Sequence, residues 1–211
     1  MPIESVRGGR YAARQHGAME FSDPPVDLDG VRRYRLERLR AEMRKEGVSG
    51  LLLFDQINTR YATDATNMQV WCSHYETRCV FVALEGPVVL YDYANHPHLA
   101  KDLPGVDEYR VMPSFYFFSA GSHCEARARK FAAEIDDLMR TYGGDDRCLG
   151  IDRLSFMPCD ALRETGLILC EGEGIAERAR SVKSDEELAL MRVSMDACEA
   201  ACHAMQQALQ P

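Results

Sequence analysis

The residues best suited to metal chemistry lie near the end of the sequence, where Cys198, Cys202 and His203 fall within one short segment. Thiols four residues apart on a helix share a face and can bind a transition metal. Both cysteines, however, continue a run of apolar positions, and on a helix His203 is turned by about 100° from Cys202. Buried thiols usually act as small hydrophobic side chains. The segment therefore predicts helix packing rather than a metal site.

Two further motifs invite a ligand-binding interpretation. His96 and His98 flank a proline, but no acidic or thiol side chains cluster beside them, so the start of a helix is the better interpretation. The run GEGIAE at 172–177 is similar to a dinucleotide-binding loop, but Glu177 stands where a third glycine is needed, and its carboxylate would repel a pyrophosphate. This run predicts a turn and a helix start. A nucleotide-dependent enzyme is therefore the least favoured function.

Familiar catalytic motifs are absent from the sequence, which has no GxSxG, no HExxH and no GxxxxGK[ST]. One segment, RYATDATNMQVW at 60–71, is not explained by secondary-structure propensity, because it has neither a helical apolar stripe nor strand alternation. It is polar but carries Tyr61, Met68 and Trp71, and Trp71 is the only tryptophan in the protein. The segment is therefore a candidate for a functional role.

The charge of the chain excludes some classes of partner. The formal net charge is −8, and an acidic protein is not attracted to nucleic acid or to an anionic membrane. A basic run extends from Arg32 to Lys45, but Glu37 and Glu42 interrupt it, which is typical of a solvated helix face. We expect neither nucleic acid nor membrane as a partner.

The cysteines and the N-terminus indicate the compartment. No apolar run approaches the ~20 residues that a membrane span needs, and the N-terminal residues contain no apolar core of a secretory signal. The eight cysteines form no CxxC pair and no zinc spacing, so reduced thiols are expected rather than a disulfide framework. These features predict a cytoplasmic protein whose residues 1–29 are an extension.

The elements that would position these residues follow an α/β pattern. A helix capped by Asp29 and ended by Gly47 is followed by a short strand, then by a hairpin that turns at Glu85 and Gly86. Strands are predicted at 50–54, 78–84, 87–93, 108–112, 148–152 and 167–170, and further helices at 122–142 and 157–166. Helices that alternate with strands, together with one hairpin, indicate a mixed sheet.

The last segment has a different pattern. Ser184 and Glu187 form a capping box, and apolar residues then recur at alternating spacings of three and four, which defines one seam along a long helix. The seam consists of Leu188, Met191, Met195, Cys198, Cys202, Met205 and Leu209. We expect such an apolar seam to pack against another apolar surface. The spacing of 3.5 favours pairing with a second copy, and folding back onto the chain's own sheet is the alternative.

The segment RSVKSDEELALMR at 180–192 resembles the hinge of the creatinase, prolidase and aminopeptidase P family, which leads into a "pita-bread" catalytic domain. FDQINTRYATDATNMQVW at 54–71, Arg78 and EGPVVLYDY at 85–93 are similar to the branch that holds dimethylsulfoniopropionate lyases and Xaa-Pro peptidase-like proteins. The resemblance covers about residues 30 to 211. It implies a creatinase-type N-terminal α/β domain with a mixed sheet at 30–178, and the first helix of a catalytic domain at 179–211.

The resemblance also implies where the chemistry lies. The family uses a pair of divalent metal ions held by two Asp, one His and two Glu, all downstream of that first helix. We therefore expect this chain to be a truncated domain with no metal or other cofactor of its own and no activity.

In these homodimeric enzymes the N-terminal domain of one subunit covers the active site of the other. The resemblance implies that Trp71 supplies a flat wall able to attract a cationic head group, and that Arg78 supplies a fork for a carboxylate. The substrate-facing candidates are Arg60, Tyr61, Asn67, Trp71, His74 and Arg78.

The function predicted from these observations is that of a non-catalytic N-terminal domain. Its parent would be a cytoplasmic, homodimeric metallohydrolase of the Xaa-Pro aminopeptidase, prolidase or creatinase kind, acting on a peptide or a small molecule. A parent of the dimethylsulfoniopropionate lyase kind and a stand-alone binding module remain the alternatives.

Overall fold

The computed structural model describes residues 26–209, so most of the predicted extension at 1–29 lies outside the described residues. Its contacts divide the described chain into a domain, Asp27–Leu188, and the remainder of the C-terminal helix. These two parts are considered separately below.

The centre of the domain is a mixed six-stranded sheet with the strand order β4-β3-β2-β1-β5-β6. Its strands are β1 (Gly50–Leu53), β2 (Cys79–Ala83), β3 (Val88–Asp92), β4 (Glu108–Val111), β5 (Cys148–Ile151) and β6 (Ile168–Glu171). β2 pairs antiparallel with β1 and with β3, which confirms the predicted hairpin, whereas the other three pairings are parallel.

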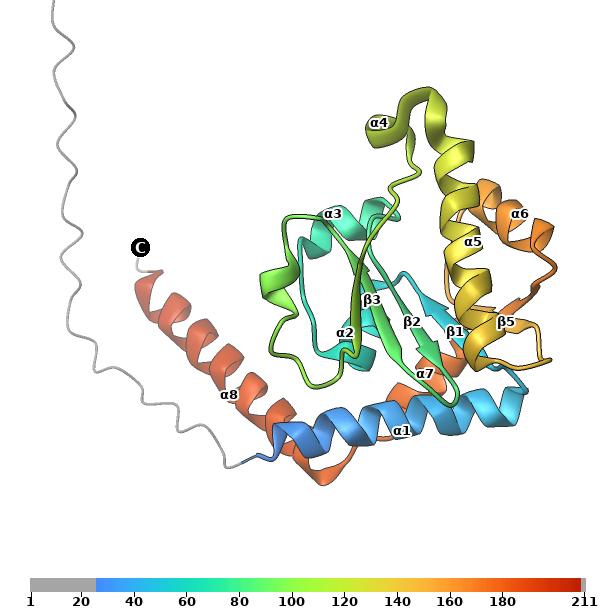
Figure 1. Cartoon of the computed structure of the whole chain (residues 1–211). Helices are drawn as coiled ribbons and strands as arrows, with labels where there is room; N and C mark the ends of the chain where they lie inside the picture. Colours follow the sequence, from blue (N-terminus) through green and yellow to red (C-terminus); the bar gives the residue numbers. More distant parts are fainter. Residues whose placement is uncertain (1–25, 210–211) are drawn as a thin grey trace, which may run out of the picture. The chain divides into compact units, whose positions relative to one another are not determined.

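Helices cover both faces of this sheet (Figure 1). The domain helices are α1 (Leu28–Glu46), α2 (Gln56–Thr63), α3 (Gln69–His74), α4 (Phe117–Ala120), α5 (Cys124–Tyr142), α6 (Phe156–Glu164) and α7 (Glu173–Ser181). The 3-10 turns are η1 (Pro97–Leu99) and η2 (Gly121–His123). The predicted α/β class with a mixed sheet is therefore confirmed.

Burial on both faces of the sheet explains why the sequences of the central strands are continuous apolar runs. In β1, Leu52 packs in the core cluster that contains α5 and α6, whereas Leu51 and Leu53 pack in the opposite cluster with α1 and α7. Successive side chains of a strand point to opposite faces, so a strand covered on both sides is apolar throughout.

The start of the first helix differs from the prediction, whereas its end at Gly47 agrees with it. α1 begins at Leu28 because Asp27, rather than Asp29, accepts the capping hydrogen bond, which comes from Gly30 N. It ends at Gly47, whose positive φ of 66° is the left-handed conformation that glycine adopts without steric cost.

The segment at 60–71, which has no recognisable sequence pattern, is also largely helical. α2 lacks an apolar stripe because most of its residues are buried whether polar or not, and Asp55 caps it through Ile57 N and Asn58 N. Asp64 and Met68 have positive φ angles of 61° and 37° and mark the break between α2 and α3. Because polar side chains take buried positions in α2, hydrophobic periodicity does not predict this helix.

The expectation that all cysteines are reduced is wrong for one pair. Cys148 in β5 and Cys170 in β6 form a disulfide with a Cα–Cα distance of 6.5 Å. The pairing of Gly150 with Cys170 places the two cysteines diagonally on neighbouring strands. Cys72, Cys79, Cys124, Cys159, Cys198 and Cys202 are free.

The C-terminal helix α8 (Asp185–Ala208) follows the predicted capping box. Glu187 N donates to Ser184 Oγ, and Ser184 N donates to Glu187 Oε2. Glu187 is also buried and accepts a hydrogen bond from Arg35 Nε at 2.7 Å, which ties the start of α8 to α1. None of the helices described for residues 26–209 is both long and apolar enough to cross a bilayer.

Candidate functional site

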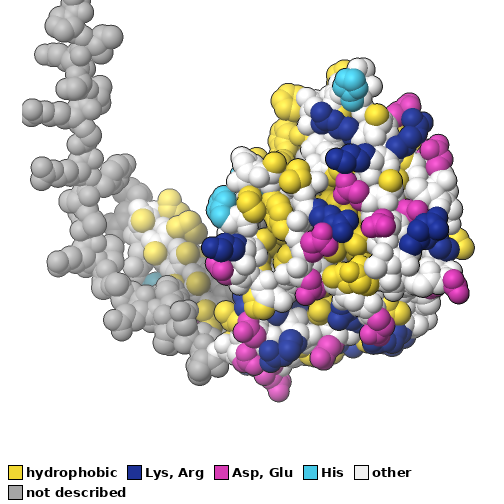
Figure 2. Space-filling view, viewed as in Figure 1, with side chains coloured by type: hydrophobic (Ala, Val, Ile, Leu, Met, Phe, Trp, Pro, Cys, Tyr) yellow, Lys and Arg dark blue, Asp and Glu magenta, His cyan; other side chains and the backbone are white. Residues whose placement is uncertain are grey.

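An aromatic cluster forms where α3 meets the segment before α5. Its members are Trp71 and Tyr75 from α3 and its C-cap, and Tyr116 and Phe118 from the N-cap and body of α4. Trp71 and Tyr116 are half-buried, whereas the Phe118 side chain is 79% exposed. Figure 2 shows hydrophobic side chains gathered over α4 and α3.

The four rings do not pack uniformly. Tyr75 lies close to two of them, with centroid distances of 4.5 Å to Trp71 and 5.0 Å to Tyr116. Three further separations are wider, at 6.5 Å for Trp71–Tyr116, 6.1 Å for Trp71–Phe118 and 6.4 Å for Tyr116–Phe118. Tyr75 therefore packs closely against both Trp71 and Tyr116, whereas Trp71, Tyr116 and Phe118 are more widely spaced from one another.

Buried polar contacts fix α3 to the sheet. Cys72 is buried, and its thiol lies 3.6 Å from the carbonyl oxygen of Asn67. The hydroxyl of Thr77 donates to Cys72 Sγ at 3.4 Å and accepts a hydrogen bond from Tyr93 at 2.8 Å. Burial raises the pKa of the Tyr93 phenol to about 12, so this hydroxyl remains a donor at neutral pH. The helix that carries Trp71 is thus held in place on its inner side.

A buried ion pair supports the loop that precedes α3. Arg78 donates from Nε to Asp92 Oδ2 at 2.7 Å and from Nη1 to Gln56 Oε1 at 3.2 Å. Asn67 donates from Nδ2 to Asp92 Oδ1 at 2.9 Å, and the same nitrogen lies 2.9 Å from His96 Nδ1. Of the predicted site residues, Asn67 and Arg78 therefore come together beneath the loop that leads to Trp71.

The segment that carries Tyr116 and Phe118 has its own anchors. Phe115 is buried against Phe131 of α5, with a centroid distance of 5.5 Å. Arg127 donates from Nη1 to the carbonyl oxygens of Ser114 and Ser119, at 3.1 and 3.4 Å. A guanidinium that binds the backbone on both sides of Tyr116 and Phe118 limits the positions that these rings can take.

Of the other three predicted site residues, Arg60 and Tyr61 belong to α2, whereas His74 lies on α3 between the cluster members Trp71 and Tyr75. Tyr61 is buried and donates to the carbonyl oxygen of Ala179 at 3.1 Å, so it faces α7. Burial raises its pKa. Arg60 is exposed near the end of α2, and His74 is exposed at the last position of α3.

The structure gives a packing reason for the glycine-rich run at 172–177. A Cβ atom at Gly172 would lie 2.6 Å from the backbone nitrogen of Ile151, so only glycine allows the close approach to β5. The helix α7 begins directly after it. The predicted turn and helix start are therefore confirmed.

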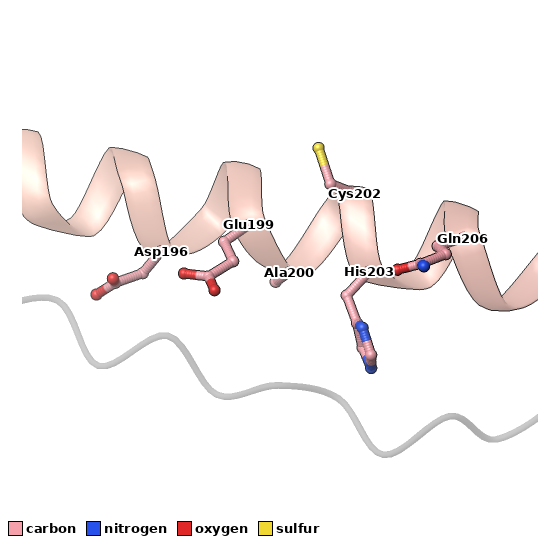
Figure 3. Close-up of a pocket in the computed structure, with 6 residues that line it drawn as sticks. All are labelled: Asp196, Glu199, Ala200, Cys202, His203 and Gln206. Carbon is pink, nitrogen blue, oxygen red and sulfur yellow. The ribbon is translucent and has the colours of Figure 1, made fainter.

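The thiol and imidazole of the C-terminal segment point apart. Figure 3 shows Cys202 on the opposite side of α8 from His203, which lies on the same side as Asp196 and Glu199. His203 Nε2 lies 2.8 Å from Gln207 Nε2 one turn further on. Within residues 26–209, no group of three or more His, Cys, Asp or Glu side chains could hold a metal ion.

Comparison with known families and proteins identifies relatives of this chain. Residues 35–182 match the description "Creatinase/Prolidase N-terminal domain". The chain is 37% identical over 180 residues to dimethylsulfoniopropionate lyase DddP of Roseobacter denitrificans, and 34% identical to the DddP of Roseovarius nubinhibens. Each alignment covers 85% of this chain and 40% of the relative, so the chain spans about two fifths of the length of these relatives.

Solved structures show the same fold at lower identity. An Xaa-Pro dipeptidase from Bacillus anthracis has a TM-score of 0.58 and 19% identity, over 84% of this chain and 43% of that one. An Xaa-Pro aminopeptidase structure from Streptococcus pyogenes has a TM-score of 0.52 and 20% identity, over 72% of this chain and 99% of that one.

Proposed function

The chain belongs to the creatinase/prolidase N-terminal domain family, and from this membership we propose that it serves as the non-catalytic N-terminal domain of a pita-bread-fold metalloenzyme. In this role the domain contributes to a homodimer, and its aromatic cluster forms a wall of the partner subunit's active site. The observation that carries the proposal is the cluster itself. Four aromatic side chains, one of them largely exposed, stand on a rigidly anchored helix and loop within a domain of this family.

We place the metal chemistry of the family outside the described residues. Residues 26–209 offer no group of three potential ligands, so they do not fit a metal pair. We therefore assign the divalent metal pair to a separate catalytic domain and derive no catalytic step from this chain.

For the reaction of the parent enzyme, we favour a lyase of the dimethylsulfoniopropionate kind. The two relatives that share more than a third of the aligned residues carry that name. The Xaa-Pro peptidases share 20% or less, which is enough for the fold alone. Hydrolysis of Xaa-Pro peptides or of creatine stays a second candidate, because the same fold supports it.

The first test is the coding sequence that follows Pro211. The proposal expects two Asp, one His and two Glu in the family's order, whereas a stop codon at this point favours a stand-alone binding module. The second test is an assay of the complete, metal-loaded protein with dimethylsulfoniopropionate, an Xaa-Pro dipeptide and creatine. Release of dimethyl sulfide supports the lyase, and turnover of only the dipeptide or creatine contradicts it.

The role of the wall has a separate test. Replacement of Trp71 by alanine in the complete protein removes part of the surface that contacts the substrate, so we expect a higher KM. The matched control is Tyr142→Ala, because Tyr142 is an exposed aromatic residue at the other end of α5. Equal KM values in the two variants would place the substrate elsewhere.

A further inference from the structure

We propose that Arg153 and Ser155, in the turn between β5 and α6, are positioning residues that hold α3 in place and thereby orient Trp71. They act through Ser73 near the end of α3 and through Glu76 just after it. The contacts of Arg153 with Ser73 and of Ser155 with Glu76 are called the α3 clasp below. The inference rests on the proposed function and deepens it, because Trp71 meets a substrate only if α3 faces the partner subunit's active site.

The first argument is that α3 needs support from outside the helix. It has six residues, whereas an isolated helix shorter than about 12 residues is marginally stable in water. Its N-cap residue, Met68, has a positive φ of 37° and makes no capping hydrogen bond with its side chain. Within α3 itself, Cys72 is the one buried residue. Contacts with other segments must therefore keep Trp71 in position.

The second argument is that a guanidinium group caps the C-terminal end of α3. Arg153 Nη2 donates to the carbonyl oxygen of Ser73 at 2.6 Å, and this oxygen belongs to the last four carbonyls of the helix, which have no partner within it. Basic side chains near a helix C-terminus stabilise it in this way. Arg153 is itself anchored, because its backbone N–H donates to Asp152 Oδ1 at 2.7 Å. The same oxygen accepts from Phe54 N at 2.8 Å, directly after β1.

The third argument is the contact that Ser155 makes. Ser155 is the N-cap residue of α6, where a serine hydroxyl ordinarily accepts a hydrogen bond from a backbone N–H of the first turn. Its side chain makes no such bond and donates to Glu76 Oε2 at 2.7 Å instead, while Ser155 N donates to Glu76 Oε1. Two donors therefore hold one carboxylate that lies 79 positions away in the sequence. The local cap of α6 is replaced by a contact with the segment that follows α3.

The α3 clasp holds the chain on both sides of Tyr75. Ser73 precedes this residue by two positions, and Glu76 follows it directly. The ring of Tyr75 lies 4.5 Å from that of Trp71, so contacts that fix one ring limit the positions of the other. Because the contacts with the sheet hold the inner side of α3 and the clasp holds its C-terminal end, Trp71 is oriented from both.

The experiment measures amide hydrogen exchange in the 211-residue chain. Arg153→Ala and Glu76→Ala each remove a charge-assisted contact, so exchange of the Tyr75 amide, whose hydrogen bond closes the last turn of α3, should become about threefold to tenfold faster. The matched control is Arg163→Ala, which breaks an exposed ion pair within α6 and should leave this rate unchanged. Slow exchange of the buried amides of β1 shows that each variant is folded. A Tyr75 rate that does not change in the clasp variants would overturn the proposal.

Substitutions of Ser155 separate the α3 clasp from a local helix cap. Aspartate is a good N-cap residue, so Ser155→Asp should preserve or stabilise α6 if this side chain serves only that helix. In the clasp its carboxylate would face that of Glu76, so we expect faster exchange in α3. Adding Glu76→Lys to Ser155→Asp makes the pair attractive again and should restore the natural rate. Exchange that becomes faster in α6 alone, or that the lysine does not restore, would contradict the clasp.

The fluorescence of Trp71, the only tryptophan of the chain, reports its environment directly. Acrylamide should quench it more strongly in Arg153→Ala and Glu76→Ala than in the natural chain or in Arg163→Ala. Equal quenching in all four proteins would show that the clasp does not orient Trp71. In the complete protein the two clasp variants should raise KM with little change in kcat. If exchange and quenching change but KM does not, the clasp stands, and the proposed contact of Trp71 with a substrate is wrong instead.

Discussion

The buried guanidinium of Arg78 and the carboxylate of Asp92 lie 2.7 Å apart, and their side chains are only 1% and 2% exposed. The second oxygen of the same carboxylate accepts a hydrogen bond from Asn67. One ion pair in the interior therefore fixes both the end of β3 and the loop that leads to Trp71. The resemblance to known enzymes implies a substrate carboxylate as the partner of Arg78, whereas in this chain Asp92 takes that place.

Breaking this pair should destabilise the domain strongly. Asp92→Asn leaves the Arg78 charge buried without a counter-ion, so we expect a loss of about 3–5 kcal/mol in the free energy of unfolding. Urea unfolding followed by circular dichroism measures it. Glu164→Gln is the control, because its pair with Arg129 is exposed and contributes about 0–1 kcal/mol. Equal losses in the two variants would show that the buried pair has no special role.

The fold and the candidate site differ in how far the sequence predicts them. The strands β1, β2 and β3 are recognisable because each is a short, largely apolar run between turn residues, and α5 because its apolar residues repeat with helical spacing. The aromatic cluster of Trp71, Tyr75, Tyr116 and Phe118 has no such local signal. Trp71 is notable as the only tryptophan, but Tyr116 and Phe118 lie more than forty positions away along the chain. Only the packing of α4 beside α3 brings them together.

The disulfide was missed for a similar reason. Cys148 and Cys170 are separated by 22 positions, and this spacing matches no known motif. They become neighbours because β5 and β6, which α6 connects along the chain, pair directly in parallel. Strand pairing joins residues that are distant in the sequence, so the number and spacing of the cysteines do not predict this bond.

The disulfide leads to a prediction about thiol content and stability. Titration with a thiol reagent in denaturant should detect six thiols in the oxidised protein and eight after reduction. Reduction should lower the free energy of unfolding by about 3 kcal/mol, because the bond closes a loop of some twenty residues in the unfolded chain. A Cys170→Ser variant should show no further loss on addition of reductant. Eight thiols in the oxidised protein would contradict the bond.

The stability of the domain should depend on pH through Glu42. Lys45 donates to this buried carboxylate at 2.7 Å and lowers its pKa, and Arg178 of α7 lies 3.4 Å away. A carboxyl group whose pKa is lower in the folded than in the unfolded chain stabilises the fold above the unfolded pKa, near 4.3. That contribution is lost as the pH falls through the folded pKa.

Glu42→Gln should therefore cost about 1.5–3 kcal/mol at pH 7, the range for hydrogen bonds to a charged group. The difference from the natural protein should shrink as the pH falls below about 4 and vanish below the folded pKa, where the carboxyl group is protonated in both states. Unfolding midpoints at pH 7 and pH 3 measure it. Glu37→Gln, on the exposed side of α1, is the control. A pH-independent difference would show that Glu42 contributes by shape rather than by charge.

The absence of a ligand cluster in residues 26–209 leads to a prediction about metal content. After dialysis at neutral pH, elemental analysis of the 211-residue chain should find less than one zinc, manganese or iron atom per chain, because no grouped ligands are available. One tightly held atom per chain, removed only by a strong chelator, would show that a site exists outside the described residues.

The apolar seam of α8 predicts self-association of this chain. Leu188, Met191, Met195, Met205 and Leu209 are between 37% and 82% exposed, and with Cys198 and Cys202 they repeat every 3.5 residues on average. Burial of seven such side chains is worth about 10 kcal/mol at most, and half of that still exceeds the cost of ordering a helix end. Because this spacing suits the seam of a coiled coil, we expect two copies to pair through α8.

Charges placed on the seam should separate the two copies. A double variant with Met195→Glu and Cys202→Glu puts carboxylates at two seam positions, so light scattering should detect a monomer. Ala197→Glu with Ala204→Glu adds the same charges to α8 away from the seam and should leave the dimer intact. If the seam variant stays dimeric, the contact lies on the domain Asp27–Leu188 instead. If the natural chain is already monomeric at high concentration, pairing through α8 is wrong, and the seam must be covered from within the same chain.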